Sequence, residues 1–261
     1  MAFTSTALQQ SPKTSPGALW TVLGALCLWL AGSQAHADDL RVLAAGAAKH
    51  AVEVLAPVFE RATGHRILAS YDTVGAQRDR VLQAAPGAVA DVAILSDAAM
   101  DALRRAGRAA DASWPVGQVV VALAVPAGTA PVDLSDEAAL RRALLTAPSI
   151  GWADPARGAT AGTHFQKVVE SLGLREALAS RTQVLPFGVE VIQAVAQGRI
   201  ALGVSQSSEI VQSPGVQLAG ALPAPHGLAT GYSAVRTSQS AAGAAFMAFL
   251  AEPQAVQAFR A

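Results

Sequence analysis

Cysteine is almost missing from this chain, because Cys27 is the one cysteine among 261 residues. A fold with a single cysteine has no internal disulfide. Net charge is missing too, since 19 Lys and Arg residues balance 19 Asp and Glu residues. We therefore expect no nucleic-acid partner, because a protein without overall charge lacks the field that attracts polyanions. No apolar run reaches the roughly twenty residues that span a bilayer.

The amino-terminal segment has the composition of an export signal. Residues 18–31 (ALWTVLGALCLWLA) form an apolar run, and residues 35–37 (AHA) give the small-x-small pattern that signal peptidase cleaves. We expect residues 1–37 to be a signal peptide, cleaved between Ala37 and Asp38, and the protein to be periplasmic. The remaining chain has no cysteine and a net charge of about −1, because one lysine and no acid precede residue 38.

From residue 40 onward, short apolar runs alternate with segments of helical periodicity. The first strand-helix units pair strands 41–45, 66–71 and 91–95 with helices 47–63, 75–84 and 97–107. A long apolar stretch, 118–126, leads to a second set with strands 150–153, 183–185 and 200–205 and helices 161–172 and 189–197. This alternation predicts parallel sheets, because parallel neighbours need crossover connections.

Two similar sets joined by a long strand predict an α/β protein of two lobes, each a mainly parallel sheet flanked by helices. We expect residues 38–120 and 229–261 to form lobe 1 and residues 121–228 to form lobe 2. Ligands of open α/β sheets bind beyond the carboxyl ends of the strands. The cleft between the lobes is therefore the predicted ligand site.

The turn after the first strand, residues 44–48 (AAGAA), joins a strand to a helix as anion-binding turns do, yet it has no hydroxyl. Its first polar side chains are Lys49 and His50. A cation at a helix start opposes the helix dipole, and an anion in the cleft would remove that penalty. A solvated helix turn is the alternative interpretation.

Further candidate positions lie in the later turns. Thr160 can cap a helix, and Gly162 would let a ligand approach the backbone closely, although capping alone also explains this turn. Glu190 and Asp72 are acids that a helix dipole or a turn would favour, and either could instead act as a general base.

The ordered motifs AAGAA, DTVGA, ADVAIL, ADPARGATAG and QGRIALGVSQSSE resemble those of the periplasmic molybdate-binding proteins of ABC importers. The resemblance covers about residues 40–260. It implies a type II solute-binding fold in which two crossing strands link the lobes and a hinge closes them on a small anion. It also implies delivery to an ABC permease in the inner membrane. We expect a monomer without cofactor, and no metal site, because the histidines lack metal-ligand spacing.

In that family two serine hydroxyls, helix-start amides and a tyrosine hydroxyl hold a tetrahedral oxyanion. Carried over by position, the ligand-binding residues are Ala47, Thr73 or Val74, Ala161, Val189 and Gln206. The turns that contain them add Gly46, Gly162 and Thr163 to the predicted ligand-binding residues. Ala47 stands at the first serine and Gln206 at the tyrosine. A missing hydroxyl removes a donor worth roughly 1.5–3 kcal/mol to a charged ligand. A carboxylate is therefore an alternative to molybdate.

Proteins similar to this family include a periplasmic aconitate isomerase, which shifts a proton across an allylic tricarboxylate. Such a reaction needs cationic groups for the carboxylates and one positioned base. The residues of these types near the predicted cleft are Lys49, His50, Glu190 and Asp72. The sequence thus predicts either capture of a small anion for an importer or isomerisation of a tricarboxylate on the same scaffold.

Overall fold

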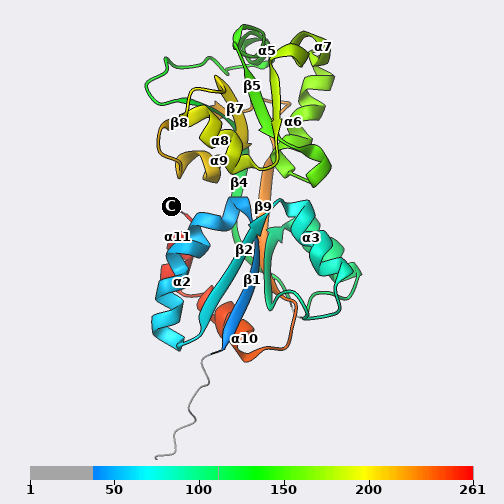
Figure 1. Cartoon of the computed structure of the whole chain (residues 1–261), viewed down its shortest axis with the longest axis vertical. Coiled ribbons are helices and arrows are strands. Elements are labelled where there is room, and N and C mark those ends of the chain that lie inside the picture. The colour runs from blue at the N-terminus through cyan, green and yellow to red at the C-terminus, as the bar shows by residue number, and fades with distance from the viewer. Residues whose placement is uncertain (1–37, 111, 261) are drawn as a thin grey trace, which may run out of the picture. The chain divides into compact units, whose positions relative to one another are not determined.

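A computed structural model describes residues 38–110 and 112–260 of the chain (Figure 1). The predicted signal peptide lies outside these residues. Among the described residues, no helix has both the length and the apolar character needed to cross a membrane.

Nine strands and a series of helices alternate along the described chain. The strands are β1 (Asp39–Ala45), β2 (Arg66–Asp72), β3 (Val92–Ser96), β4 (Trp114–Pro126), β5 (Ile150–Ala153), β6 (Thr182–Leu185), β7 (Leu202–Gln206), β8 (Val216–Ala221) and β9 (Ala229–Arg236). The α-helices are α2 (Lys49–Thr63), α3 (Val74–Gln83), α4 (Asp97–Arg105), α5 (Glu137–Thr146), α6 (Thr160–Ser171), α7 (Arg175–Leu178), α8 (Gly188–Ala196), α9 (Ser207–Val211), α10 (Ala241–Phe249) and α11 (Pro253–Ala258). Short 3-10 turns are η1 (Gly46–Ala48), η2 (Pro155–Arg157) and η3 (Ala179–Arg181).

Lobe 1 is built around β2, β1, β3 and β9. Strand β1 pairs in parallel with β2 and with β3, and β9 runs antiparallel to β3. Helix α2 covers this sheet with Val52, Leu55 and Phe59, which recur at helical spacing and are fully or almost fully buried. The helix ends, as the sequence predicts, at Gly64, whose φ of 78° only glycine adopts without strain.

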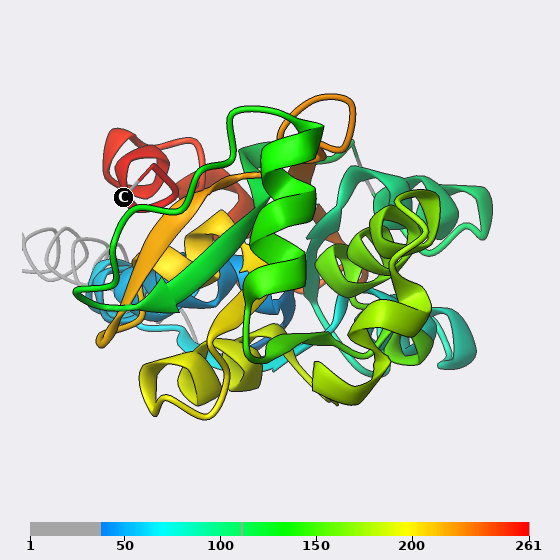
Figure 2. The same cartoon turned by 90° about the horizontal axis from the view of Figure 1, so that it is seen from above.

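Lobe 2 is built around β7, β5, β6 and β8. Strand β5 pairs in parallel with β6 and β7, while β4 runs antiparallel to β7 and β8. Helix α5 packs on this sheet through Leu140 and Leu144, and Figure 2 shows it lying across the lobe. Trp152 and Phe165 meet edge to face in the same core, with ring centroids 5.3 Å apart.

Two strands, β4 and β9, run between the lobes (Figure 1). Strand β4 pairs with β9 in lobe 1 up to Val120 and with β7 in lobe 2 from Val121 onward. One strand therefore belongs to both sheets, and a rotation about it would move one sheet relative to the other. The α/β class and the two crossing strands agree with the sequence, whereas the residue boundaries given for the lobes stay a prediction.

Candidate functional site

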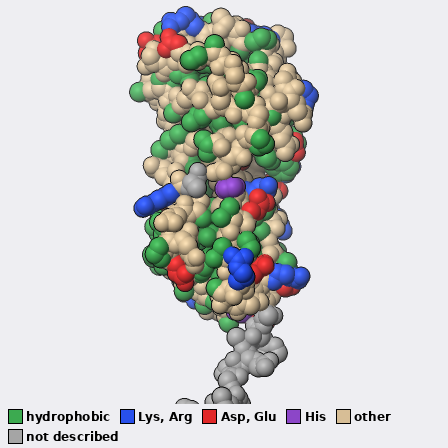
Figure 3. Space-filling view, turned by 90° about the vertical axis from the view of Figure 1, so that its left-hand side faces the viewer, with side chains coloured by type: hydrophobic (Ala, Val, Ile, Leu, Met, Phe, Trp, Pro, Cys, Tyr) green, Lys and Arg blue, Asp and Glu red, His purple; other side chains and the backbone are tan. Residues whose placement is uncertain are grey.

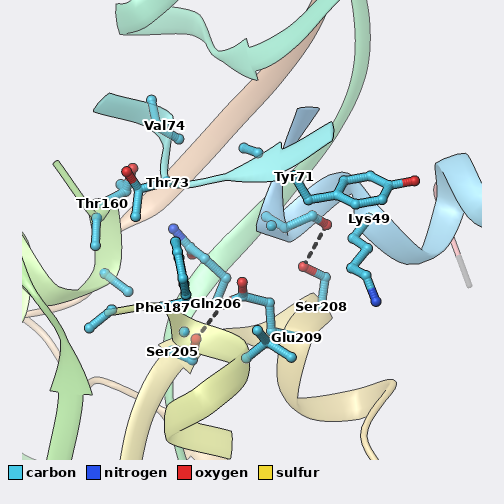
Figure 4. Close-up of a pocket in the computed structure, with 18 of the residues that line it drawn as sticks. Lys49, Tyr71, Thr73, Val74, Thr160, Phe187, Ser205, Gln206, Ser208 and Glu209 are labelled. Carbon is cyan, nitrogen blue, oxygen red and sulfur yellow. Dashed lines mark hydrogen bonds between the residues drawn. The ribbon is translucent and has the colours of Figure 1, made fainter. Parts of the chain in front are cut away.

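The described residues enclose a cavity of about 410 Å³ between the lobes. This volume lies within the range of roughly 300–1,000 Å³ that small-molecule sites occupy. Lobe 1 contributes Ala45, Gly46, Ala47, Lys49, His50, Glu53, Tyr71, Asp72, Thr73, Val74 and Tyr232. Lobe 2 contributes Ala153, Ala159, Thr160, Ala161, Phe187, Gly188, Val189, Ser205, Gln206, Ser208, Glu209, Gln212 and Ser213. Both lobes therefore contribute to its wall (Figure 4).

Three helix starts at this cavity have no side-chain cap. The capping positions are Ala45 before η1 and α2, Ala159 before α6 and Phe187 before α8. None of these side chains accepts a hydrogen bond, so the first N–H groups of each helix keep their donor capacity. A Ser or Asp cap would add about 1 kcal/mol at each start. The chain forgoes this stabilisation where the amides face the cavity.

Most of the predicted binding residues meet at the cavity. Its lining includes seven of the predicted ligand-binding residues, Gly46, Ala47, Thr73, Val74, Ala161, Val189 and Gln206, and three of the candidate catalytic residues, Lys49, His50 and Asp72. They converge because the strands before them end at the same place, as expected for paired α/β lobes.

Three predicted positions do not line the cavity. Gly162 lies against β5, where a Cβ would overlap the carbonyl of Ala153, so the absence of a side chain here allows α6 to pack closely on the sheet. Thr163 and Glu190 lie farther along α6 and α8 than the cavity-lining positions. Thr160, expected to be a cap, is instead the first residue of α6, and it lines the cavity.

Thr73 and Asp72 already have partners within the protein. The Thr73 hydroxyl donates to the backbone carbonyl of Arg157 in lobe 2 and accepts from the N–H of Ala76 at 3.2 Å. Asp72 accepts from the N–H of Thr73 at 2.7 Å and forms an ion pair of 3.4 Å with Arg157. The second hydroxyl of the predicted oxyanion site is thus engaged in a contact between the lobes.

Lys49 and His50 lie at the rim of the cavity. The Lys49 ammonium pairs with Glu53 at 3.3 Å and lies 5.8 Å from the ring centroid of Tyr71. His50 is exposed. Figure 3 shows histidine and charged side chains of both signs gathered where the two lobes meet. Because Glu53 balances Lys49, the rim carries little net charge.

Gln206 is the buried polar side chain that the cavity leaves without a partner. It ends β7, where it is 4% exposed, and among the described residues neither its amide nitrogen nor its amide oxygen has a hydrogen-bond partner of good geometry, although the Tyr232 hydroxyl lies close to it. A buried amide without partners costs free energy comparable to lost hydrogen bonds. In Figure 4 it points into the space beside Thr73 and Thr160. The sequence predicted this position from the tyrosine of the resembled family.

Glu209 is the functional candidate that sequence reasoning did not find. The Ser205 hydroxyl and the backbone N–H of Gln206 donate to its carboxyl, and burial, which outweighs both bonds, raises its pKa above the usual 4.5. Its position, three residues after the cap of α9, matches the capping box. That pattern explains the Gln206 contact, but it does not reveal that the carboxyl lines the cavity (Figure 4).

Tyr232 on the crossing strand β9 is buried, 5% exposed, and lies close to the side chains of Thr160 and Gln206. Burial, together with the nearby Glu209 carboxyl, raises the pKa of its phenol. The hydroxyl therefore stays protonated and can donate at neutral pH.

The chain matches known proteins over most of its length. Residues 40–261 match the family described as bacterial extracellular solute-binding protein. An aconitate isomerase of a Pseudomonas species is 28% identical over 229 residues, which cover 84% of each chain. The periplasmic molybdate-binding protein of Azotobacter vinelandii has a TM-score of 0.65 at 22% identity, covering 85% of this chain and 96% of that one.

A third similar structure is the sulfate-binding protein SubI of Mycobacterium tuberculosis, with a TM-score of 0.64 at 18% identity and 85% of each chain covered. At these identities the solved structures show the fold, which is that of a type II solute-binding protein, as the sequence predicts. The family match covers the cavity and both lobes. The chain therefore belongs to the bacterial extracellular solute-binding proteins.

Proposed function

We propose that the protein captures a small organic carboxylate between its lobes in the periplasm and delivers it to an ABC permease of the inner membrane. The observation that carries this proposal is the group of uncapped helix starts at one cavity, together with the unpaired Gln206. Free helix-start amides favour an anionic oxygen. The Gln206 amide can both donate to a carboxylate and accept from a hydroxyl.

A carboxylate suits this site better than a tetrahedral oxyanion. Ala47 brings no hydroxyl, Thr73 donates its own to Arg157, and Gln206 supplies an amide where the resembled family has a phenol. A cavity of about 410 Å³ has room for a carbon skeleton, which a tetrahedral oxyanion lacks. Lys49 and His50 at the rim can reach a second carboxylate of the same molecule.

Calorimetric titration of the purified protein with mono-, di- and tricarboxylates, molybdate and sulfate tests the proposal. We expect heat with at least one carboxylate, and Gln206→Ala to weaken that binding about tenfold or more, since a hydrogen bond to a charged group contributes about 1.5–3 kcal/mol. Gln193→Ala is the matched control, because Gln193 is exposed on α8 in the same lobe. Absence of binding to every compound would refute the proposal.

A second candidate function is isomerisation of an unsaturated tricarboxylate, which Glu209 favours. A carboxyl with a raised pKa can remove a proton from one carbon and return it to another while the double bond shifts, so that substrate and product differ only in the position of hydrogen and double bond. The 28% identity to an aconitate isomerase points the same way. Lys49 and His50 would hold substrate carboxylates.

Proton NMR of the protein with trans-aconitate tests this second candidate. Conversion to the cis isomer is expected, with a loss of about 100-fold or more in Glu209→Gln, the range for removal of a general base. Glu190→Gln is the control acid, because Glu190 lies outside the cavity lining. Unchanged spectra at high protein concentration would eliminate the enzyme hypothesis and leave capture as the function.

A further inference from the structure

The Glu209 carboxyl lies between two helix starts that come from different lobes. A Cβ at Gly46, in the turn leading into α2, would collide with one carboxyl oxygen, and a Cβ at Gly188, the first residue of α8, would collide with the other. In this position the carboxyl occupies the space that a Cβ would take at either glycine. An acid of the protein itself therefore lies beside both helix starts at which an anionic oxygen would bind.

The groups that hold this carboxyl carry no charge. Its hydrogen bonds come from the hydroxyl of Ser205 and the backbone N–H of Gln206. The titratable side chains that share the cavity with it are Lys49, His50 and Glu53 of α2, Tyr71 and Asp72 of β2, and Tyr232 of β9. Lys49 pairs with Glu53, and Asp72 pairs with Arg157. Among the groups at the cavity, the Lys49 ammonium is thus already paired with an acid other than Glu209.

We call the space between the Gly46 turn and the start of α8 the cradle. We infer that Glu209 closes the cradle to fully ionised oxyanions and selects a solute that brings its own hydrogen-bond donor, which is a hydroxyl or a protonated carboxyl. A dianion at the cradle would face the carboxylate at contact distance, so it could enter only after Glu209 takes up a proton. A hydroxyl or protonated carboxyl can instead donate to the carboxylate. The unpaired Gln206 beside it remains for a second group of the same solute.

This inference rests on the proposed capture of a solute and specifies its chemical class. If a dianion can enter only when Glu209 is protonated, the affinity of the protein for that dianion falls tenfold for each pH unit above the pKa of the Glu209 carboxyl. A neutral amide at this position has no such dependence. The Glu209→Gln variant keeps the size of the side chain and adds an N–H donor, so we expect the cradle to accept oxyanions in that variant.

The experiment is titration of the purified full-length protein with molybdate between about pH 6.5 and pH 8.5, where molybdate remains a dianion. Glu209→Gln should bind molybdate at least about tenfold more tightly than the parent protein at the upper pH, with an affinity that does not vary with pH. Glu190→Gln should behave like the parent protein.

Three results would overturn the inference. These are equal molybdate affinity in the parent protein and Glu209→Gln at high pH, the same gain in Glu190→Gln, or no molybdate binding by either protein at any pH. Circular dichroism confirms that each variant is folded before it is titrated. Capture itself is judged separately, by whether the parent protein binds a carboxylate. If the parent protein binds citrate and Glu209→Gln gains no molybdate binding, the proposed capture stands and the proposed role of Glu209 in selectivity is refuted.

Discussion

Two glycines meet across the cleft, and a single methyl group tests whether their contact holds the lobes together. Gly75 in α3 donates its N–H to the carbonyl of Gly158 at 3.1 Å. A Cβ at Gly75 would lie 2.6 Å from the Cα of Gly158 and 3.0 Å from the carbonyl oxygen of Arg157, both backbone atoms. We therefore expect Gly75→Ala to force the lobes apart at this point.

The magnitude follows from the contacts that lie beside the added methyl group. Separation breaks the Gly75–Gly158 bond, the Thr73 bond to Arg157 and the exposed ion pair of Arg157 with Asp72. Two neutral hydrogen bonds contribute about 0.5–1.5 kcal/mol each and an exposed ion pair about 0.2–1 kcal/mol. A loss of about 1.2–4 kcal/mol in the closed form weakens solute affinity roughly 8- to 900-fold.

The same substitution should not weaken lobe 1 itself. Alanine is favoured over glycine inside a helix by about 0.8–1 kcal/mol. The three atoms nearest to the new methyl group belong to Arg157 and Gly158 of lobe 2. We expect the midpoint of thermal unfolding to stay constant or rise while the lobes open. This combination distinguishes a lost contact between lobes from general destabilisation.

The assay is a distance measurement between spin labels. With Cys27 replaced by serine, cysteines at the exposed Gln83 of α3 and Lys167 of α6 give one label on each lobe. Gly75→Ala should lengthen the distance between them, whereas Gly117→Ala, whose Cβ meets only an ordinary 3.6 Å contact, should not. An unchanged distance distribution in Gly75→Ala would refute the view that this contact closes the cleft.

Three further substitutions test the packing and the acids. Gly162→Ala should destabilise lobe 2 by about 2–4 kcal/mol in chemical unfolding, because the methyl group would overlap the carbonyl of Ala153. Burial alone would raise the pKa of Asp91, but its hydrogen bonds with Arg41 outweigh burial and hold the pKa below 3.8. The Asp91 carboxylate therefore stabilises the fold above pH 3.8, and this stabilisation is lost as pH falls through the folded pKa. Asp91→Asn should therefore cost about 1–3 kcal/mol at pH 7 and little in strong acid, and a constant difference across pH would contradict this. Glu209 should give stability the opposite pH dependence, because its pKa is raised: the free energy of unfolding should fall as pH rises from 4.5 through the folded pKa. Thermal unfolding measured across pH should show that this fall is absent in Glu209→Gln.

Much of the fold could be predicted because apolar runs and helical spacing are local signals. The buried strand 92–96 and the helix face of Val52, Leu55 and Phe59 are set by the hydrophobic effect on neighbouring residues. The turn at Gly46 was recognisable for the same reason. Local signals thus placed the cavity at the ends of the correct strands.

The function of single side chains was harder to predict, because it depends on contacts distant in sequence. Gly162 looked like a place for a ligand, yet it packs on Ala153 of β5. Thr160 looked like a cap, but the chain enters α6 one residue earlier at Ala159. Glu209 fits a capping box, and only the meeting of α9 with the turn at Gly46 brings its carboxyl into the cavity.

Helix α9 links closure of the lobes to the chemistry of the cavity. Its Ser208 hydroxyl donates to the carbonyl of Ala47 at 2.9 Å, and its Glu209 carboxyl reaches Gly46 in the same turn. Gln206, the residue directly before α9, pairs with Val121 of the crossing strand β4. A rotation about β4 that opens the cleft must therefore withdraw the Ser208 hydroxyl and the Glu209 carboxyl from lobe 1 together. Opening would then expose the carboxyl to water and lower its pKa toward the usual value, so proton uptake and lobe closure are coupled in the same direction.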